Sequence, residues 1–342
     1  MIFPDNVMQD FPLRDFNTFH MDVSAKVCMT VSGIDDLERV FRHEVLMHMP
    51  RLVIGGGSNL LLTGPVDKLV LHMRMKGISR EREDDDYVYL RAAAGEQWQD
   101  LVDWCLENGL GGLENLAGIP GTVGAAPVQN IGAYGAELKD CFFSLRAFDF
   151  TSGKLVEMNR DDCRFAYRDS IFKHEMKDRL VIVDVTLALP KRWTPNITYG
   201  DVAHELEKLG IARPSPADIG NVIAKIRRRK LPDPAVLGNA GSFFKNPTVT
   251  AGEVMTLKQR YPDIPAYGQA DGRYRIAAGW LIDRCGWKGR RIGDAGVCET
   301  QALVLVNHGH ASGESIVALA QAIEQDVMSR FGIRLEPEPV FV

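Results

Sequence analysis

The feature that most constrains this chain is a glycine-rich stretch at residues 109–138, GLGGLENLAGIPGTVGAAPVQNIGAYGAEL. Its glycines and two prolines exclude a single regular helix or strand, because glycine costs conformational entropy and proline removes a backbone donor. Its many Leu, Ile and Val residues argue against disorder. A loop of this length inside a compact protein usually has a function. The sequence therefore predicts a long, ordered loop with an accessible backbone.

A second glycine segment, GGGSN at residues 55–59, follows a short apolar strand predicted at residues 51–54. Successive backbone N–H groups of glycine can approach a phosphate closely. The spacing is not the G-x-G-x-x-G of a classical dinucleotide fold, no helix is predicted to follow, and a plain tight turn also explains three glycines. Taken with Gly118–Gly135, however, it indicates a long ligand clamped between two glycine-lined surfaces, which a dinucleotide with a pyrophosphate fits.

Length and composition bound the class of protein. The chain has 342 residues, which favours two or three domains, and its net charge of −5 argues against a nucleic-acid-binding protein. His308 and His310 are interpreted as part of a surface turn, and no metal site is predicted. No signal peptide or membrane span is expected. Six scattered cysteines indicate reduced thiols in a cytoplasmic protein: Cys28, Cys105, Cys141, Cys163, Cys285 and Cys298.

The hydrophobic pattern predicts mixed helices and strands. A βαβ-like unit is expected in the first 75 residues, and the EREDDD run at 81–86 is expected to be a solvated turn. Trp98 is expected in the protein core, on the buried face of a helix that ends at Gly109. Strands are predicted within 141–189 and at 302–307, and helices at 217–229, 251–260, 277–285 and 313–331, the last with Ser312 as N-cap.

Two short segments could carry chemistry, and each has a structural alternative. In RFAYRDSIFK (164–173), the planar guanidinium of Arg168 suits a carboxylate or phosphate, but an ion pair with Asp169 is equally compatible. In GNAGSFFKNP (238–247), Ser242 could transfer a proton in a dry pocket, but the segment could also be only a turn.

Two further segments are charged. The helix end RRRKLPDP (227–234) could complement the helix dipole or grip a diphosphate. In the C-terminal LEPEP, Glu336 and Glu338 lie two residues apart on an extended chain and point the same way. Because apolar residues surround them, this end of the chain is expected to dock rather than fray.

In order along the chain, these segments resemble the UDP-N-acetylenolpyruvoylglucosamine reductase family. The resemblance runs nearly end to end and is carried by NTFHM, GGGSNLL, GLENLAGIPGTVGAAPVQNIGAYG, CRFAYRDSIFK, ITYGD, RRRKLPDP, GNAGSFFKNP, AAGWLID, QALVLVN and LEPEP. Tyr199 in ITYGD indicates the longer type I of the family, which closes a tyrosine-bearing loop over its substrate.

The resemblance implies an α+β protein with the three-domain FAD-binding fold of the vanillyl-alcohol oxidase/PCMH type. The expected FAD-binding subdomains are 1–76, joined by a C-terminal strand at 334–342, and 77–231, and the expected substrate-binding domain is 232–333. The implied cofactors are FAD and NADPH, and the implied substrate is UDP-N-acetylglucosamine enolpyruvate, a precursor in peptidoglycan synthesis. A cytoplasmic monomer is expected, with no nucleic-acid or membrane partner.

The resemblance also assigns residues. The implied FAD-binding residues are Gly55, Gly56, Gly57, Ser58, Asn59, Gly118, Ile119, Pro120, Gly121, Gly124, Ala125, Ala126, Asn130, Gly132, Ala133, Tyr134 and Gly135. The implied substrate-binding residues are Tyr199, Arg227, Lys230, Asn246 and Gln301. Ala125 and Ala126 stand where some relatives carry serines, which puts a side-chain hydroxyl contact to FAD there in doubt.

The implied reaction is hydride delivery from flavin N5 to the enolpyruvyl β-carbon, followed by protonation of the α-carbon. Arg168 and Glu338, protonated or sharing a proton, would meet the charge on the substrate carboxylate, and Ser242 would be the general acid. The alternatives are another FAD-dependent oxidase or dehydrogenase of this fold and a non-catalytic nucleotide-sugar-binding module. Neither glycine segment contains the His or Cys with which many flavin oxidases attach their cofactor.

Overall fold

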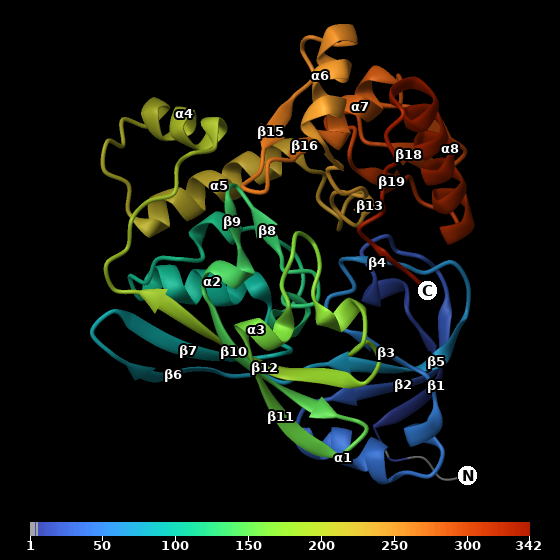
Figure 1. Ribbon diagram of the computed structural model, residues 1–342. Helices are drawn as coiled ribbons and strands as arrows, with labels where there is room; N and C mark the ends of the chain where they lie inside the picture. The colour runs from blue at the N-terminus through green and yellow to red at the C-terminus, as the bar shows by residue number, and fades with distance from the viewer. Residues whose placement is uncertain (1–3, 5) are drawn as a thin grey trace. The chain divides into compact units, whose positions relative to one another are not determined.

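The computed structural model describes residue 4 and residues 6–342, and the chain forms two compact units (Figure 1). The first unit contains residues up to 11, 25–57 and 67–229. The second contains residues 12–24, 58–66 and 230–342. Each unit is therefore built from segments that lie far apart in the sequence.

In the described part of the chain, the first unit contains two larger sheets and one two-stranded sheet. The four-stranded sheet has the strand order β1-β2-β5-β3, and β3 pairs with β5 in parallel. The five-stranded sheet has the order β11-β10-β12-β7-β6, and all its pairs are antiparallel. The strands of these two sheets are β1 (Val7–Pro12), β2 (Ser24–Val31), β3 (Arg51–Ile54), β5 (Val66–Met73), β6 (Ile78–Glu83), β7 (Tyr87–Ala93), β10 (Phe142–Asp149), β11 (Lys154–Asn159) and β12 (Leu180–Pro190).

The EREDDD segment differs in part from its prediction. The structure continues β6 through Glu83, so only residues 84–86 form the turn to β7. A strand can carry so many charges here because β6 lies at the edge of its sheet and is exposed along most of its length. Arg91 on β7 pairs with Glu81 across the two strands.

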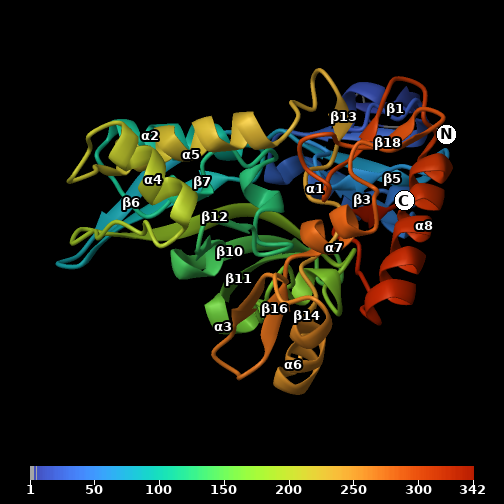
Figure 2. The same cartoon turned by 90° about the horizontal axis from the view of Figure 1, so that it is seen from above.

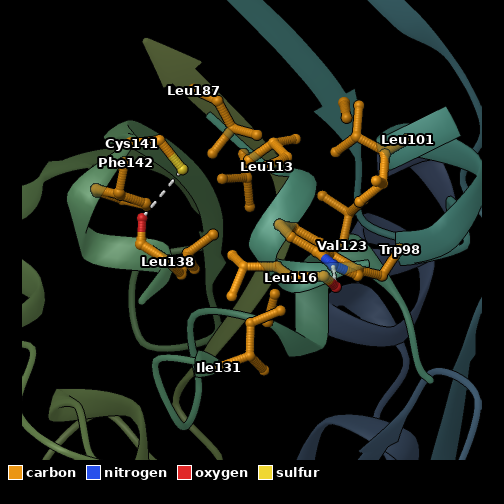
Figure 3. Close-up of a cluster of buried hydrophobic side chains, with 14 of the residues drawn as sticks. Trp98, Leu101, Leu113, Leu116, Val123, Ile131, Leu138, Cys141, Phe142 and Leu187 are labelled. Atoms are coloured by element: carbon orange, nitrogen blue, oxygen red, sulfur yellow. Dashed lines mark hydrogen bonds between the residues drawn. The ribbon is translucent and has the colours of Figure 1, made fainter. Parts of the chain in front are cut away.

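The main core of the first unit contains the interior of the glycine-rich loop (Figure 3). Trp98 is fully buried, as predicted, and its indole N–H donates to the carbonyl of Leu116 at 3.0 Å. Leu113, Leu116 and Val123 pack in the same cluster. The apolar side chains of the loop thus hold it in place. Its glycines contribute no packing and instead allow the backbone conformations that the loop needs.

Among the described residues, the α-helices of the first unit are α1 (Ile34–Arg42), α2 (Trp98–Glu107), α3 (Arg160–Cys163), α4 (Gly200–Lys208) and α5 (Pro216–Lys230). No helix was predicted at α4, although Val202 and Leu206 have helical i, i+4 spacing and are buried. Glu205 on α4 pairs with Lys225 and Arg229 of α5, so the two helices lie side by side (Figure 2). Hydrogen bonding to Arg229 lowers the pKa of Glu205 to about 2.

The second unit is built from short strands and α-helices. Its strands are β4 (Leu60–Leu61), β13 (Gly238–Asn239), β14 (Thr248–Val249), β15 (Ala266–Gly268), β16 (Tyr274–Ile276), β17 (Arg291–Ile292), β18 (Ala295–Val297), β19 (Leu305–Asn307) and β20 (Val340–Phe341). They form sheets of order β13-β19-β18-β17 and β14-β16-β15 and the parallel pair β20-β4. Its helices are α6 (Ala251–Arg260), α7 (Ala278–Arg284) and α8 (Gly313–Phe331).

Two predictions for the second unit are confirmed. The Ser312 hydroxyl accepts the amide of Ser315 at the start of α8, and the apolar stripe of that helix is buried. The C-terminal segment docks, since β20 pairs with β4 and the Thr63 amide donates to the carbonyl of Val342 at 2.7 Å. The predicted three-domain boundaries stay a prediction.

Within the described part of the chain, no helix combines the length and apolar composition needed to cross a bilayer. Residue 4 and residues 6–342 also contain no cluster of three or more His, Cys, Asp or Glu side chains suited to a metal ion.

Candidate active site

The two glycine segments touch each other within the first unit. A β-carbon on Gly55 would lie 2.0 Å from the Thr122 hydroxyl oxygen, and one on Gly56 would lie 3.3 Å from the α-carbon of Gly121. Neither position has room for an ordinary side chain without a shift of its neighbours. Glycine is therefore required because two loops pass with their backbones almost in contact.

The same loops leave backbone donors available. Gly57 and Gly121 have positive φ values of 61° and 113°, which favour glycine. Among the described residues, the amides of Gly55, Gly56 and Gly57 donate to no backbone carbonyl. A cradle of close glycine backbones with unused N–H groups fits a pyrophosphate, and so it fits FAD.

We expect Gly55→Ala to weaken FAD binding by about 10-fold or more, because overpacking of this kind typically costs about 1–3 kcal/mol. The measurement is the dissociation constant of FAD by fluorescence quenching of the apoprotein. Adding Thr122→Gly should restore much of the affinity, because it removes the side chain that the new methyl group meets. Unchanged affinity in Gly55→Ala would contradict this account of the cradle.

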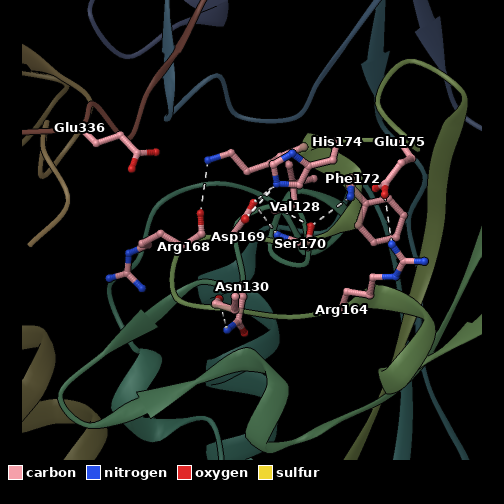
Figure 4. A network of polar contacts seen from close by, with 12 residues as sticks. Val128, Asn130, Arg164, Arg168, Asp169, Ser170, Phe172, His174, Glu175 and Glu336 are labelled. Carbon is pink, nitrogen blue, oxygen red and sulfur yellow. Dashed lines mark hydrogen bonds and ion pairs between the residues drawn. The ribbon is translucent and has the colours of Figure 1, made fainter. Parts of the chain in front are cut away.

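A turn at residues 166–169 presents Arg168. Ala166 and Asp169 form a β-bridge, and Arg168 between them has a φ of +54°. Its guanidinium donates to the carbonyl of Gly132 at 2.6 Å, on the hairpin of β8 (Gly132–Ala133) and β9 (Ala136–Glu137). In Figure 4 this guanidinium points away from Asp169, whose carboxylate instead pairs with His174 at 2.9 Å.

Buried polar groups fasten that turn to the glycine-rich loop (Figure 4). The Asn130 amide donates to the carbonyl of Ala166 at 3.0 Å, and the Ser170 hydroxyl donates to the carbonyl of Val128 at 2.7 Å. Asn130 has no exposed area, and its side chain also bonds Glu137 and the amide of Lys139. Its side chain is thus engaged in holding the loop and the Arg168 turn together.

Two arginines at the basic end of α5 have different partners. Arg229 pairs with Glu205, whereas Arg227 donates from Nε to the carbonyl of Gly118 at 3.0 Å. Burial lowers the pKa of Arg227, and the positive charge of Arg168 lowers it further, whereas Tyr134 opposes both. Among the described residues Arg227 forms no ion pair with a carboxylate. Because the two guanidinium groups repel each other, an anion that binds to both is stabilised.

Tyr199 precedes α4 and is exposed. Its ring meets the ring of Tyr134 edge to face, with the centroids 5.3 Å apart. Four predicted site residues of the first unit, Arg168, Arg227, Tyr134 and Tyr199, are therefore linked through contacts or mutual electrostatic effects.

In the second unit, Ser242 lies between two anchored residues. The Gly241 amide donates to the side chain of Asn239 at 2.9 Å, and Gly241 has a φ of +68°. On the other side, the Phe243 amide donates to the carbonyl of Leu303 at 2.8 Å. The chain bends at Gly241 between β13 and the bridge residue Phe244, and hydrogen bonds hold the backbone of this turn on both sides of Ser242.

The C-terminal LEPEP segment runs beside this turn. The Glu338 amide donates to the carbonyl of Phe243 at 2.8 Å, and the Lys245 amide donates to the carbonyl of Glu336 at 2.9 Å. The Glu338 residue is 9% exposed, and its carbonyl accepts from the Asn59 amide group at 3.3 Å. The structure therefore brings Glu338 next to the residue that follows Ser242. Arg168 belongs to the first unit, and its meeting with these two residues stays a prediction.

The predicted substrate-binding residues of the second unit gather at the start of α7. The Asn246 side-chain oxygen accepts the amide of Ala278 at 2.9 Å, and a β-carbon on Gly279 would lie 3.2 Å from the Gln301 side-chain oxygen. The carbonyl of Lys230 accepts from the hydroxyl of Thr300, the neighbour of Gln301, at 3.3 Å.

The sequence did not predict the contacts of Thr122 and Asn115. Both lie inside the glycine-rich loop, where no periodicity or motif distinguishes one polar side chain from its neighbours; Thr122 contacts Gly55 and Asn115 contacts the carbonyl of Tyr134. Only the folded path of the loop shows what these side chains contact.

The comparisons with known proteins agree across the chain. Residues 233–342 match the C-terminal domain family of UDP-N-acetylenolpyruvoylglucosamine reductase, and residues 25–159 match an FAD binding domain family. The chain is 54% identical over 333 residues to the UDP-N-acetylenolpyruvoylglucosamine reductase of Paraburkholderia phymatum, covering 97% of this chain and 96% of that one. It is 52% identical to the enzyme of Burkholderia mallei, covering 98% and 97%.

Solved structures confirm the predicted fold class, with helices and sheets in an FAD-binding fold followed by a C-terminal domain. UDP-N-acetylenolpyruvylglucosamine reductase from Thermus caldophilus superposes with a TM-score of 0.65 at 24% identity, covering 98% of this chain and 97% of that one. A solvent-stable cholesterol oxidase superposes with a TM-score of 0.50 at 14% identity, covering 98% and 87%.

Proposed function

We propose, because this chain belongs to the UDP-N-acetylenolpyruvoylglucosamine reductase family, that it reduces UDP-N-acetylglucosamine enolpyruvate to UDP-N-acetylmuramate with NADPH as reductant. The observation that carries the proposal is the cradle formed by the two glycine segments, together with cationic and aromatic side chains at its edge. The product is a precursor of peptidoglycan, so the protein serves cell-wall synthesis.

FAD, when bound, supplies the transfer of a hydride between NADPH and the substrate. The residues that would hold it are those of the two glycine segments, through backbone amides rather than side chains. Because Ala125 and Ala126 lack hydroxyls, this chain depends on its backbone at that point.

The substrate's diphosphate is assigned to Arg227, which has no carboxylate partner among the described residues, with Lys230 as a second cation. Tyr199 is assigned to the sugar nucleotide, because its exposed ring is held next to Tyr134 at the edge of the glycine-rich loop. Asn246 and Gln301 are assigned to its polar groups, because both amides reach the start of α7.

The acid–base assignments use three residues. Arg168 would bind the substrate carboxylate and stabilise the negative charge that grows there during reduction, helped by Glu338. Ser242 would give its hydroxyl proton to the α-carbon. A serine hydroxyl is a weak acid, so this role needs a neighbour that stabilises the alkoxide or returns a proton, and buried Glu338 is the candidate.

The test is an anaerobic two-step experiment. NADPH should bleach the yellow colour of the purified holoenzyme, and UDP-N-acetylglucosamine enolpyruvate added afterwards should restore it with formation of UDP-N-acetylmuramate. Reoxidation by oxygen and an alcohol, but not by the enolpyruvyl sugar, would support an oxidase of the same fold instead. A colourless protein that binds no FAD would indicate a nucleotide-sugar-binding module.

The proposal includes a cytoplasmic monomer. The six free thiols and the nucleotide substrates fit a reducing compartment. Sedimentation of the holoenzyme at a mass well above 38.0 kDa would contradict the monomer.

A further inference from the structure

One hairpin connects two of the proposed functional residues. Gly132, on β8, accepts the hydrogen bond from Arg168, and the turn that follows places the Tyr134 ring against Tyr199. Tyr134 and Gly135 in that turn have φ values of +47° and +81°. A turn with a non-glycine residue at positive φ is held by its surroundings rather than by its own preference.

Asn115 lies beneath this turn and is 2% exposed. Its amide nitrogen donates to the carbonyl of Tyr134 at 2.8 Å and to the carbonyl of Asn196 at 3.0 Å. Asn196 in turn donates to the carbonyl of Gly135 at 3.0 Å. One buried amide thus joins the hairpin to the segment that leads into Tyr199.

The segment before Tyr199 has a second anchor. The Trp193 indole N–H donates to the buried carboxylate of Glu114 at 2.8 Å, and its ring covers Gly111 so closely that a β-carbon there would lie 2.3 Å from it. Trp193 and Asn196 therefore both attach residues 193–196 to the glycine-rich loop. What continues beyond Asn196 is the exposed stretch that ends in Tyr199.

The other half of the Asn115 amide indicates why an asparagine is present. Its side-chain oxygen is buried and has no hydrogen-bond partner among the described residues. A buried acceptor without a partner is unfavourable, and leucine, which has the same number and branching of side-chain heavy atoms, would avoid this cost. The unpaired oxygen therefore lowers stability, and the two hydrogen bonds that the amide nitrogen donates are the reason for an asparagine at this position.

We propose that Asn115 is a positioning residue that holds the Tyr199 segment in register with the hairpin that contacts Arg168. Removing its donors lets residues 196–199 leave the hairpin, so that only a fraction of molecules present Tyr199 correctly. The apparent affinity for the nucleotide sugar then falls in proportion to that fraction. The consequence for turnover rests on the proposed function, whereas the attachment of the segment does not.

The test compares the wild-type holoenzyme with Asn115→Leu. We expect the KM for UDP-N-acetylglucosamine enolpyruvate to rise about 10-fold, while kcat changes less than about threefold and the rate of flavin reduction by NADPH stays the same. Chymotrypsin should cut after Tyr199, within the released segment, several-fold faster in the variant. The proteolysis result is independent of catalysis, so it tests the attachment even if the proposed function is wrong.

Two further variants separate positioning from general destabilisation. Asn196→Ala removes the bond to Gly135 and the bonds that its side-chain oxygen accepts from Thr198, but keeps the bond from Asn115 to the carbonyl of residue 196. It should give a smaller rise in KM and in cleavage rate, which keeps the test decisive if Asn115→Leu folds poorly. Asp36→Ala is the control, because it removes a buried carboxylate that bonds the amides of Ser32 and Gly33 in the same unit. It should lower the melting temperature without changing KM. Unchanged KM and cleavage in both asparagine variants, or an equal loss of both half-reactions, would overturn the proposal.

Discussion

Ser242→Ala is expected to lose turnover of the enolpyruvyl sugar while keeping reduction of the flavin by NADPH. A positioned general acid typically contributes about 10²–10⁴-fold, and the loss in the second half-reaction should fall in that range. The backbone of the turn should not change, because Gly241 and Phe243 are held by hydrogen bonds from their own amides rather than by the serine hydroxyl. Stopped-flow absorbance of the flavin measures the two half-reactions separately.

The control for Ser242→Ala is Asn239→Ala. Asn239 accepts the amide of Gly241 and donates to the carbonyls of Pro232 and Leu237, so its loss should disturb the whole turn. That variant should lower both the melting temperature and the substrate half-reaction. If Ser242→Ala instead slowed both half-reactions equally, the serine would belong to flavin binding or folding and not to proton transfer.

Local periodicity predicted the helices in which apolar residues recur at regular spacing along the buried face. Ile316, Leu319, Ile323 and Val327 recur at helical spacing, and Ser312 stands where an N-cap belongs, so α8 could be predicted to its first residue. The helix α4 has the same signal in only two buried apolar positions, Val202 and Leu206, and it was not recognised. A nine-residue helix contains too few turns for a pattern to stand out.

Contacts between distant segments could not be predicted from either segment alone. The three glycines at 55–57 were compatible with a tight turn until the folded chain placed Thr122 against Gly55. Position 115 is one asparagine among many, and its two carbonyl partners lie 19 and 81 residues away. Such pairs depend on topology, which propensity does not encode.

In the candidate site, too, the local conformation could be predicted from the sequence, and the contact with a distant segment could not. Prolines on both sides of Glu338 predicted an extended segment, and the structure pairs Pro337 with Phe244 in a β-bridge. The family resemblance implied only that residues 334–342 join the subdomain 1–76, and the bridge to Phe244 was not predicted. The motif match assigned Ser242 and Glu338 to one site, and the register of this bridge supplies a physical reason for it, because it aligns the two segments residue by residue.

Arg168→Lys is expected to lower kcat for reduction of the enolpyruvyl sugar by about 10²–10³-fold, although it keeps the positive charge. One Arg168 nitrogen donates to the carbonyl of Gly132, and a guanidinium presents five N–H donors in a planar fork, so it can keep this bond while it binds both oxygens of a carboxylate. A lysine ammonium cannot hold that carbonyl and present a flat pair of donors together. Loss of one preorganised donor at developing charge typically costs about 3–4 kcal/mol.

Arg164→Lys is the matched control for this substitution. Arg164 lies four residues earlier, has a φ of +47° like the +54° of Arg168, and pairs with exposed Glu175 at 3.1 Å. Any cost of placing lysine in this backbone conformation should therefore appear in both variants, and only Arg168→Lys should slow the substrate step. Equal effects in the two variants would mean that charge in this segment matters and the fork does not. Because flavin reduction by NADPH does not involve the substrate carboxylate, its rate should be the same in wild type, Arg168→Lys and Arg164→Lys.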